Sequence, residues 1–184
     1  KISVYDPSNG EEIATVAAQT YSYDSAWLNG IFYTNYYNIV YQWALNDEGE
    51  IENIGSFGHP NGGYTYALGA SMENQWLITK NTNNSYALEF FTVNEDGEFD
   101  EMVGELTDYA QYAGNYQYTY NVEWADAHMD VGPMWIRYNT NTWQVMVDTE
   151  NWECSAPEDE ALQDPIETLT GYNYCGVAHD GVDM

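Results

Sequence analysis

Two acidic turns carry the residues that are best suited to binding a metal ion. Their closely spaced carboxylates are Asp47, Glu48, Glu50, Asp96, Glu98 and Asp100. Carboxylate oxygens are the ligands that Ca²⁺ prefers in proteins. The spacing does not follow the EF-hand loop, because an EF-hand alignment of the second turn would place Thr92 and Val103 at the first and last ligand positions. We therefore expect either a weak Ca²⁺ site at these turns or ordinary solvated hairpin turns, and the sequence indicates no other cofactor.

The sequence contains no residue pattern that is typical of catalysis. The histidines His59, His128 and His179 are far apart and show no H-E-x-x-H spacing. A G-x-S-x-G nucleophile motif is also missing from the sequence. With 30 acidic residues, no single carboxylate pair stands out as the acid and base of a glycosidase. We therefore assign no catalytic residue.

Tyrosines form the clearest candidate for a binding surface. One group lies early in the chain and another in its second half: Tyr33, Tyr36, Tyr37, Tyr116, Tyr118 and Tyr120. The alternate spacing of the second group places its rings on one face of a strand. Tyrosine rings stack against sugars and against neighbouring proteins. We expect these residues to contact a glycan or a partner subunit, with plain packing on a sheet as the alternative.

The two cysteines, Cys154 and Cys175, indicate an oxidising compartment. They lie outside any C-x-x-C motif, so we expect one disulfide, with two buried free thiols as the alternative. The disulfide would close a loop of about 20 residues and contribute about 3 kcal/mol. The chain starts at Lys1 rather than Met, which is typical of a processed mature terminus or of a fragment. Asn83 begins an N-glycosylation sequon, Asn-Asn-Ser, at a predicted turn.

The charge balance limits the kinds of partner that this chain can bind. It has 30 acidic residues, 3 basic residues and a net charge of −27. Nucleic acids and anionic lipids require clustered Lys and Arg, so binding to either is excluded. No apolar run is long enough to span a membrane. The expected partners are cations, neutral glycans, another extracellular protein or further copies of the chain itself.

Strand and turn signals repeat along the chain. Apolar and aromatic residues alternate on both sides of polar turns that contain Gly10, Gly49 and Gly97. Asn-Gly and Asp-Gly pairs suit such turns because they adopt positive φ angles. A further strand pattern recurs at residues 31–35, 76–80 and 134–138. The chain therefore consists of imperfect repeats of roughly 40–60 residues, each with up to four strands.

These repeats predict an all-β fold made of four-stranded antiparallel units. We expect a β-propeller-like or related β array, with a β-sandwich as the alternative. The predicted units, which together form one domain, are residues 1–17, 18–57, 58–106 and 107–153, followed by a disulfide-tied segment at 154–184. Within that last segment, residues 168–177 are predicted to form a further strand that completes the unit begun by the N-terminus.

One repeat resembles the blades of a known family. The run from Trp76 to Val103, WLITKNTNNSYALEFFTVNEDGEFDEMV, is similar to a blade of the lactonase-like, YVTN-type β-propellers. Residues 1–17 and 18–57 resemble parts of such blades as well. The resemblance implies stacked four-stranded blades. Members of that family usually close with six to eight blades, which is more than the three to four units expected here. No functional residue carries over from the resemblance.

Together these features favour a protein that acts through its surface. We expect a secreted or cell-surface protein, non-catalytic, that works by self-assembly or by attachment to another protein. One alternative is a glycan-binding module that uses the tyrosine groups. The other is a secreted hydrolase or lactonase-like enzyme, which would need carboxylates that converge in a deep pocket.

The net charge alone predicts how stability depends on salt. Repulsion among carboxylates opposes folding, and salt at 0.1 M screens it beyond about 10 Å. We expect the melting temperature to rise with added NaCl or CaCl₂ and to hold or rise on mild acidification, as measured by differential scanning calorimetry. A melting temperature that is indifferent to ionic strength would contradict this expectation.

Overall fold

The protein is all-β, as the sequence predicts. This computed structural model describes residues 1–6, 8–17, 22–114, 121–138 and 141–167. Within these residues the ordered elements are β-strands and three short 3₁₀ turns, η1 (Tyr109–Tyr112), η2 (Asp126–His128) and η3 (Glu160–Leu162). The strands form repeated four-stranded antiparallel sheets, which confirms the predicted fold class.

A two-stranded ribbon precedes three larger sheets. The ribbon pairs β1 (Ile2–Tyr5) with β2 (Glu12–Val16). The first sheet contains β3 (Ser25–Leu28), β4 (Ile31–Tyr36), β5 (Ile39–Leu45) and β6 (Ile51–Gly58). The second contains β7 (Thr65–Ser71), β8 (Trp76–Asn81), β9 (Ala87–Val93) and β10 (Phe99–Leu106). The third contains β11 (Asn121–Trp124), β12 (Met134–Tyr138), β13 (Asn141–Asp148), β14 (Glu153–Ser155) and β15 (Ile166–Glu167).

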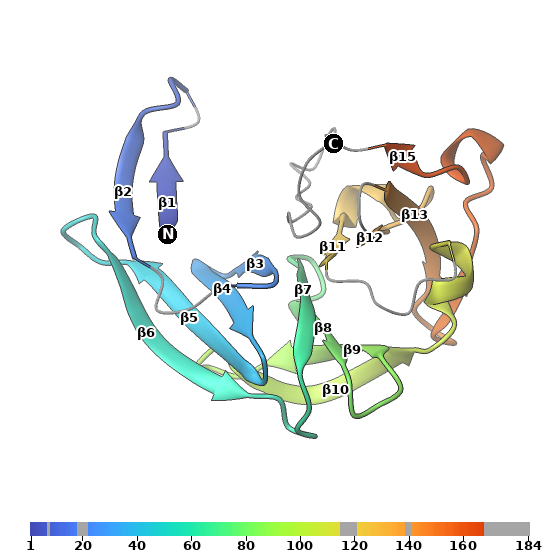
Figure 1. Cartoon of the computed structure of the whole chain (residues 1–184), viewed down its shortest axis with the longest axis horizontal. Helices are drawn as coiled ribbons and strands as arrows, with labels where there is room; N and C mark the ends of the chain where they lie inside the picture. The colour runs from blue at the N-terminus through green and yellow to red at the C-terminus, as the bar shows by residue number, and fades with distance from the viewer. Residues whose placement is uncertain (7, 18–21, 115–120, 139–140, 168–184) are drawn as a thin grey trace.

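The sheets stand side by side in an arc, as in part of a propeller (Figure 1). The first strand of each larger sheet, β3, β7 or β11, lies toward the inside of the arc, while β6 and β10 lie on its outside. In each larger sheet, successive strands pair antiparallel with their neighbours. The third sheet adds one irregularity, because β15 pairs with β13 beside β14.

Local hydrogen bonds explain why the predicted turns form. In the β5–β6 turn, Asn46 Oδ1 accepts the N–H groups of Glu48 and Glu50 at 3.0 and 2.9 Å. Asn94 does the same in the β9–β10 turn, where it accepts from Asp96 and Glu98 at 3.0 and 2.9 Å. An Asx side chain that satisfies the turn backbone in this way stabilises a tight hairpin. Two sequence-distant repeats therefore share one turn mechanism.

Two apolar interfaces hold the three larger sheets together. One lies between the first and second sheets and includes Leu28, Tyr33, Leu77 and Phe91. The other, between the second and third sheets, contains a set of fully buried side chains: Ile78, Leu88, Phe90, Leu106, Met134, Ile136 and Val145. Burial on both faces explains the apolar runs in β8 and β9, because neither strand has an exposed residue.

The Asp96–Gly97 turn joins two sheets. Gln42 Nε2 donates to Asp96 O at 2.7 Å, and the Tyr33 hydroxyl donates to Gly97 O at 3.0 Å. A Cβ on Gly97 would lie only 2.7 Å from Ile31 Cδ1 and from the Tyr33 hydroxyl. Tyr33 is 1% exposed. The expectation that Tyr33 contributes to a binding surface is therefore wrong, because its ring fills the core between these sheets.

Asp24 connects the inner strands of all three larger sheets. It precedes β3, is 4% exposed, and accepts hydrogen bonds on Oδ2 from the N–H of Leu68 in β7 at 2.9 Å and of Val122 in β11 at 3.1 Å. A neighbouring glycine, Gly69, allows the two strands to approach, since a Cβ there would lie 2.9 Å from Val122 O. One buried carboxylate therefore satisfies edge N–H groups from two different sheets.

Burial changes the acidity of two carboxyl groups in this region. It raises the pKa of Asp24 to about 7, although hydrogen bonds from Leu68, Asn121 and Val122 partly offset the effect. Burial, followed by the nearby charges of Asp24 and Asp126, raises the pKa of Glu123 to about 8. Because both folded-state pKa values lie above the unfolded values, the folded protein binds protons more tightly than the unfolded chain. Stability from these groups is fully present below the unfolded pKa values of 3.8 and 4.5 and is lost as the pH rises to the folded-state values of about 7 and about 8.

Replacing Asp24 tests this pH dependence. We expect the wild type to gain stability as the pH falls from about 9 to about 5, since protonation removes the desolvation penalty of the buried carboxyl groups. Asp24→Asn should weaken that dependence, as measured by the urea midpoint of unfolding at each pH. The exposed-turn variant Asp47→Asn serves as the control and should keep the wild-type slope. Equal slopes for the two variants would contradict the assignment.

Candidate functional site

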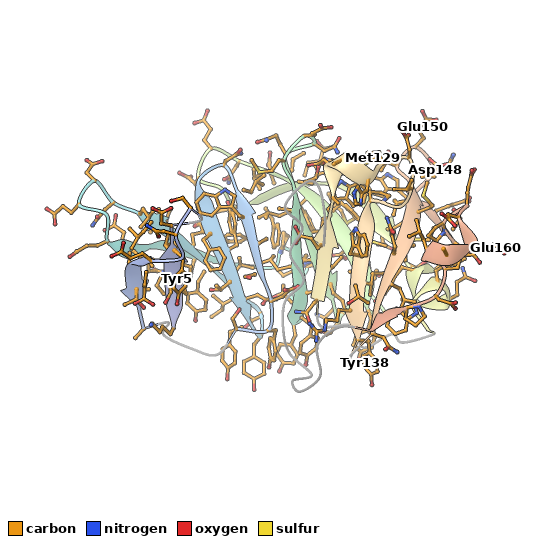
Figure 2. The ribbon with its side chains drawn as sticks, turned by 90° about the horizontal axis from the view of Figure 1, so that it is seen from above. Tyr5, Met129, Tyr138, Asp148, Glu150 and Glu160 are labelled. Atoms are coloured by element: carbon orange, nitrogen blue, oxygen red, sulfur yellow. The ribbon has the colours of Figure 1, made fainter. Side chains whose placement is uncertain are left out.

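Strand direction brings several loops together at one end of the sheets. β4, β6, β8 and β12 end there, while β3, β5, β7 and β9 begin there. Figure 2 marks this end by Tyr138, the last residue of β12, and marks the opposite end by Met129, Asp148 and Glu150. We call the end that carries Tyr138 the tyrosine end.

Five tyrosine rings meet at the tyrosine end over the first and second sheets. They come from the segment before β3, the β4–β5 turn and the start of β7, and we call them the tyrosine cluster: Tyr23, Tyr36, Tyr37, Tyr64 and Tyr66. Ring centroids lie 4.3 Å apart for Tyr36 and Tyr37, and 5.1 Å apart both for Tyr37 and Tyr64 and for Tyr23 and Tyr66. Tyr37 is 41% exposed and Tyr64 is 45% exposed. The cluster therefore presents aromatic surface to solvent.

Tyr37 is held in an unfavourable backbone conformation. Its φ angle is +53°, in the two-residue turn between β4 and β5. This left-handed region costs a residue with a bulky side chain about 1–2 kcal/mol, and turns of this kind usually place Gly there. The side chain nevertheless contacts Tyr23, Tyr36 and Tyr64. The backbone strain therefore accompanies an exposed aromatic residue at the tip of a hairpin.

Two hydroxyl groups of the cluster, those of Tyr23 and Tyr66, have pKa values raised above the usual value of a phenol. Burial, followed by the electrostatic effect of Tyr37, raises the pKa of Tyr23 to about 12. Burial also raises the pKa of Tyr66, with a smaller effect from Tyr64 and Tyr37. A protonated phenol both donates and accepts hydrogen bonds. The cluster therefore combines apolar ring surface with neutral polar groups.

A buried polar network supports the loops beside the cluster. His59 Nε2 lies 2.6 Å from Glu89 Oε2, and both side chains are fully buried. Because His59 Nδ1 accepts the N–H of Asn61 at 3.1 Å, the ring proton sits on Nε2 and faces Glu89. Asn81 Nδ2 donates to both carboxylate oxygens of Glu89 at 3.2 Å. Burial pushes the pKa of Glu89 upward, but the hydrogen bonds from His59 and Asn84 outweigh it and hold this pKa below its usual value.

This network fixes the β6–β7 loop, which carries Tyr64, and the neighbouring β8–β9 turn. Asn81 Oδ1 accepts the N–H of Asn83 at 2.9 Å, which shapes the β8–β9 turn. Thr82 Oγ1 accepts the N–H of Tyr64 at 2.9 Å, which ties the β6–β7 loop to that turn. Exposed amide side chains at Asn38, Asn61 and Asn83 lie on the loops of the tyrosine end. The loops therefore present both rings and amides.

A second candidate surface lies on the face of the first sheet that is turned away from the second sheet, which we call the outer face. Trp27, Phe32 and Trp43 stand in register across β3, β4 and β5 on the face opposite the second sheet. A cavity of about 280 Å³ lies between this face and the β1 strand, and its lining is Ile2, Ser3, Val4, Trp27, Phe32, Trp43, Ala44, Leu45 and Ile51. Trp27 is 52% exposed and Leu45 is 46% exposed. The β1–β2 ribbon therefore covers this apolar face only in part.

The acidic residues proposed as Ca²⁺ ligands lie on two separate hairpins. Asp47, Glu48 and Glu50 belong to the β5–β6 turn; Asp96, Glu98 and Asp100 belong to the β9–β10 hairpin. Within the described residues, no group of three or more His, Cys, Asp or Glu side chains is placed to hold a metal ion. The Asn46 and Asn94 hydrogen bonds already account for the shape of both turns. Weak Ca²⁺ binding at these turns stays a prediction.

The structure describes only one of the two cysteines. Cys154, in β14, has a free and buried thiol, and burial raises its pKa. Its expected partner, Cys175, lies outside the described residues, so the disulfide stays a prediction. The same holds for Tyr116, Tyr118 and Tyr120, which also lie outside them. Asn83 is exposed in the β8–β9 turn, and its glycosylation is likewise untested.

Sequence reasoning found only part of the tyrosine cluster. It named Tyr36 and Tyr37 but missed Tyr23, Tyr64 and Tyr66. A usable signal exists, because each missed tyrosine stands beside the start of an inner strand, β3 or β7. The roles of Asp24, His59 and Glu89 were missed for another reason: each depends on partners that are distant in the chain.

Comparisons with known proteins do not define a family. No protein-family model matches the chain, and no curated protein does. Among solved structures, the chain is similar to the crystal structure of the Saccharomyces cerevisiae Sqt1, with 8% sequence identity and a TM-score of 0.44. That match covers 73% of this chain and 34% of the other, so this chain spans about a third of that protein's length. No helix among the described residues has the length and apolar character needed to cross a membrane.

The His59–Glu89 pair should be important for stability. Glu89→Ala leaves the Nε2–H of the neutral His59 ring and the amide of Asn81 buried without their acceptor, and leaving a buried donor unsatisfied typically costs about 1–3 kcal/mol. We expect a correspondingly lower urea midpoint, measured by tryptophan fluorescence. Glu95→Ala, in an exposed turn, is the control and should change stability by less than about 0.5 kcal/mol. Similar effects of the two substitutions would contradict the structural role of the pair.

Proposed function

We propose that this chain is a non-catalytic extracellular protein that acts by self-assembly, with the outer face of the first sheet as the contact between copies. The observation that supports this most directly is the incompletely covered row of Trp27, Phe32 and Trp43. The extracellular part of the proposal rests on the acidic composition and the two cysteines.

Both faces of the first sheet carry apolar side chains, as in a sheet that is covered on both sides. Its inner face packs on the second sheet through Leu28, Tyr33 and Val40. Its outer face carries Trp27, Phe32 and Trp43, and among the residues that the structure describes it faces the two-stranded ribbon, which leaves Trp27 half exposed. Exposed apolar patches with polar surroundings mark interaction sites in soluble proteins. A further layer against this face would bury the exposed part of Trp27.

The adjoining strand edge suits a second copy of the same chain. Within the described residues, β1 hydrogen-bonds to β2 alone, so its other edge is available for pairing. Two identical strands pair antiparallel about a two-fold axis, and the same axis brings two identical apolar faces together. The free edge and the apolar row therefore fit one isologous dimer.

Charge decides when such a dimer forms. Exposed carboxylates surround the surface at Glu11, Glu12, Glu50 and Glu52, and Lys1 already pairs with Glu12 at 2.9 Å. With a net charge of −27 on each copy, association at low salt is opposed by repulsion. Screening by salt or partial protonation relieves that repulsion.

The oligomeric state tests the proposal. We expect a 21.0 kDa monomer at low salt and a dimer or larger assembly at high salt or near pH 5, as measured by light scattering after size exclusion. Raising NaCl from about 0.01 M to about 1 M shortens the Debye length from about 30 to about 3 Å. Trp27→Glu should abolish the assembly. Met129→Glu, which alters an exposed apolar residue at the far end of the third sheet, should not.

Two results would overturn self-assembly through this face. One is a protein that stays monomeric at high concentration across all salt, Ca²⁺ and pH conditions. The other is an assembly that Trp27→Glu and Met129→Glu affect equally, which would place the contact elsewhere. Because Trp27 is half exposed, we expect Trp27→Glu to fold normally. A cooperative thermal unfolding curve for the variant checks this.

A further inference from the structure

We propose that the tyrosine cluster is a binding site for neutral carbohydrate chains. This site is separate from the apolar face used in the proposed assembly. It lies at the tyrosine end, over the first and second sheets, and its exposed rings are Tyr37 and Tyr64.

The arrangement of the rings suits a sugar. Carbohydrates bind proteins by placing the C–H face of a pyranose ring against an aromatic ring, while hydroxyl groups bond to nearby polar side chains. Tyr37 and Tyr64 have ring centroids 5.1 Å apart and an interplanar angle of 55°. Behind them, Tyr23, Tyr36 and Tyr66 hold the exposed rings in place through further ring contacts. The rings therefore form a supported, solvent-facing platform.

The strained backbone of Tyr37 supports a role beyond packing. A φ angle of +53° in a two-residue turn favours Gly, yet a tyrosine is present. The ring is 41% exposed, so burial of apolar surface only partly compensates for the strain. Residues held in strained conformations cluster at binding and catalytic sites, where the orientation of the side chain is what matters. The strain at Tyr37 orients an exposed ring at the hairpin tip.

The polar groups near the cluster match hydroxyl-rich ligands. Exposed amides at Asn38, Asn61 and Asn83 both donate and accept hydrogen bonds, as sugar hydroxyls do. The loops that carry Asn61 and Asn83 are fixed by the hydrogen bonds of His59 and Asn81. Loops held in this way lose little conformational entropy on binding.

Charge selects neutral over acidic sugars. Each copy carries a net charge of −27, so uronic-acid or sulfated chains meet repulsion as they approach. Neutral chains have no such penalty, and their affinity should depend little on ionic strength. A binding surface for a basic protein would instead weaken strongly as salt increases.

Native gel electrophoresis in polysaccharide-containing gels tests the site on the full chain. Galactomannan, mixed-linkage β-glucan and dextran are the neutral probes, and alginate is the anionic comparison. We expect at least one neutral polysaccharide to retard the wild type, with no retardation by alginate and little change on adding salt. Calorimetric titration with a soluble oligosaccharide of the retarding polymer then provides the dissociation constant.

The variant Tyr37→Gly separates binding from stability. It removes the exposed ring and relieves the strained φ angle, so we expect at least a tenfold weaker affinity with a melting temperature near that of the wild type or above it. Asn29→Gly is the matched control, because Asn29 has the same φ of +53° in another hairpin turn and lies outside the cluster. Tyr5→Ala removes an exposed tyrosine outside the cluster and should also bind normally.

Two outcomes would overturn the proposal. One is a wild-type protein that none of the neutral polysaccharides retards, or that alginate retards as strongly. The other is an affinity that Tyr37→Gly lowers no more than Asn29→Gly does. Loss of self-association in Tyr37→Gly without any carbohydrate binding would reassign the cluster to a protein interface. Since Trp27→Glu leaves the cluster intact, failure of the assembly proposal is distinguishable from failure of this one.

Discussion

The arrangement of the three larger sheets depends on the buried carboxylate of Asp24. Sheets that stack in an arc expose the inner edges of their first strands, and the N–H groups on those edges need acceptors. Asp24 supplies one acceptor for Leu68 of β7 and Val122 of β11. Gly69 makes the contact possible by letting the two strands approach closely. Asp24 therefore links segments of the chain that are 98 residues apart.

Such a design connects fold stability with the unusual charge of the chain. With only Lys1, Lys80 and Arg137 available, basic residues cannot pair with most carboxylates. Some acids are stabilised instead by Asn side chains and backbone N–H groups, as Asp148 is by Asn151 and Glu150. Asp24 is buried and Glu123 is half-buried, and both have raised pKa values. Added protons stabilise the folded state in two ways. They weaken the repulsion among surface carboxylates, and they neutralise the desolvated carboxyl groups of Asp24 and Glu123.

Much of the fold could be predicted because its signals are local. The Asn46 and Asn94 turns, and the apolar and aromatic residues that favour strands in β4, β5 and β9, act over a few positions. The candidate sites were harder to predict. Tyr33 and Tyr36 lie three residues apart in β4 and therefore point to opposite faces, and Tyr33 is the buried one, with its hydroxyl bonded to Gly97, 64 residues away. The adjacent residues do not specify which of the two faces packs against the second sheet.

By itself, the sequence determined an all-β chain of repeated four-stranded units, its acidity and the positions of its hairpin turns. These follow from side-chain alternation and from turn chemistry that a few neighbouring residues decide. Only the tertiary structure decided which tyrosines converge, which apolar face is left partly covered, and which carboxylates are buried. His59 meets Glu89 and Asp24 meets Val122 because separate sheets stack. Contacts across that distance depend on how the sheets are placed, which local sequence patterns do not specify.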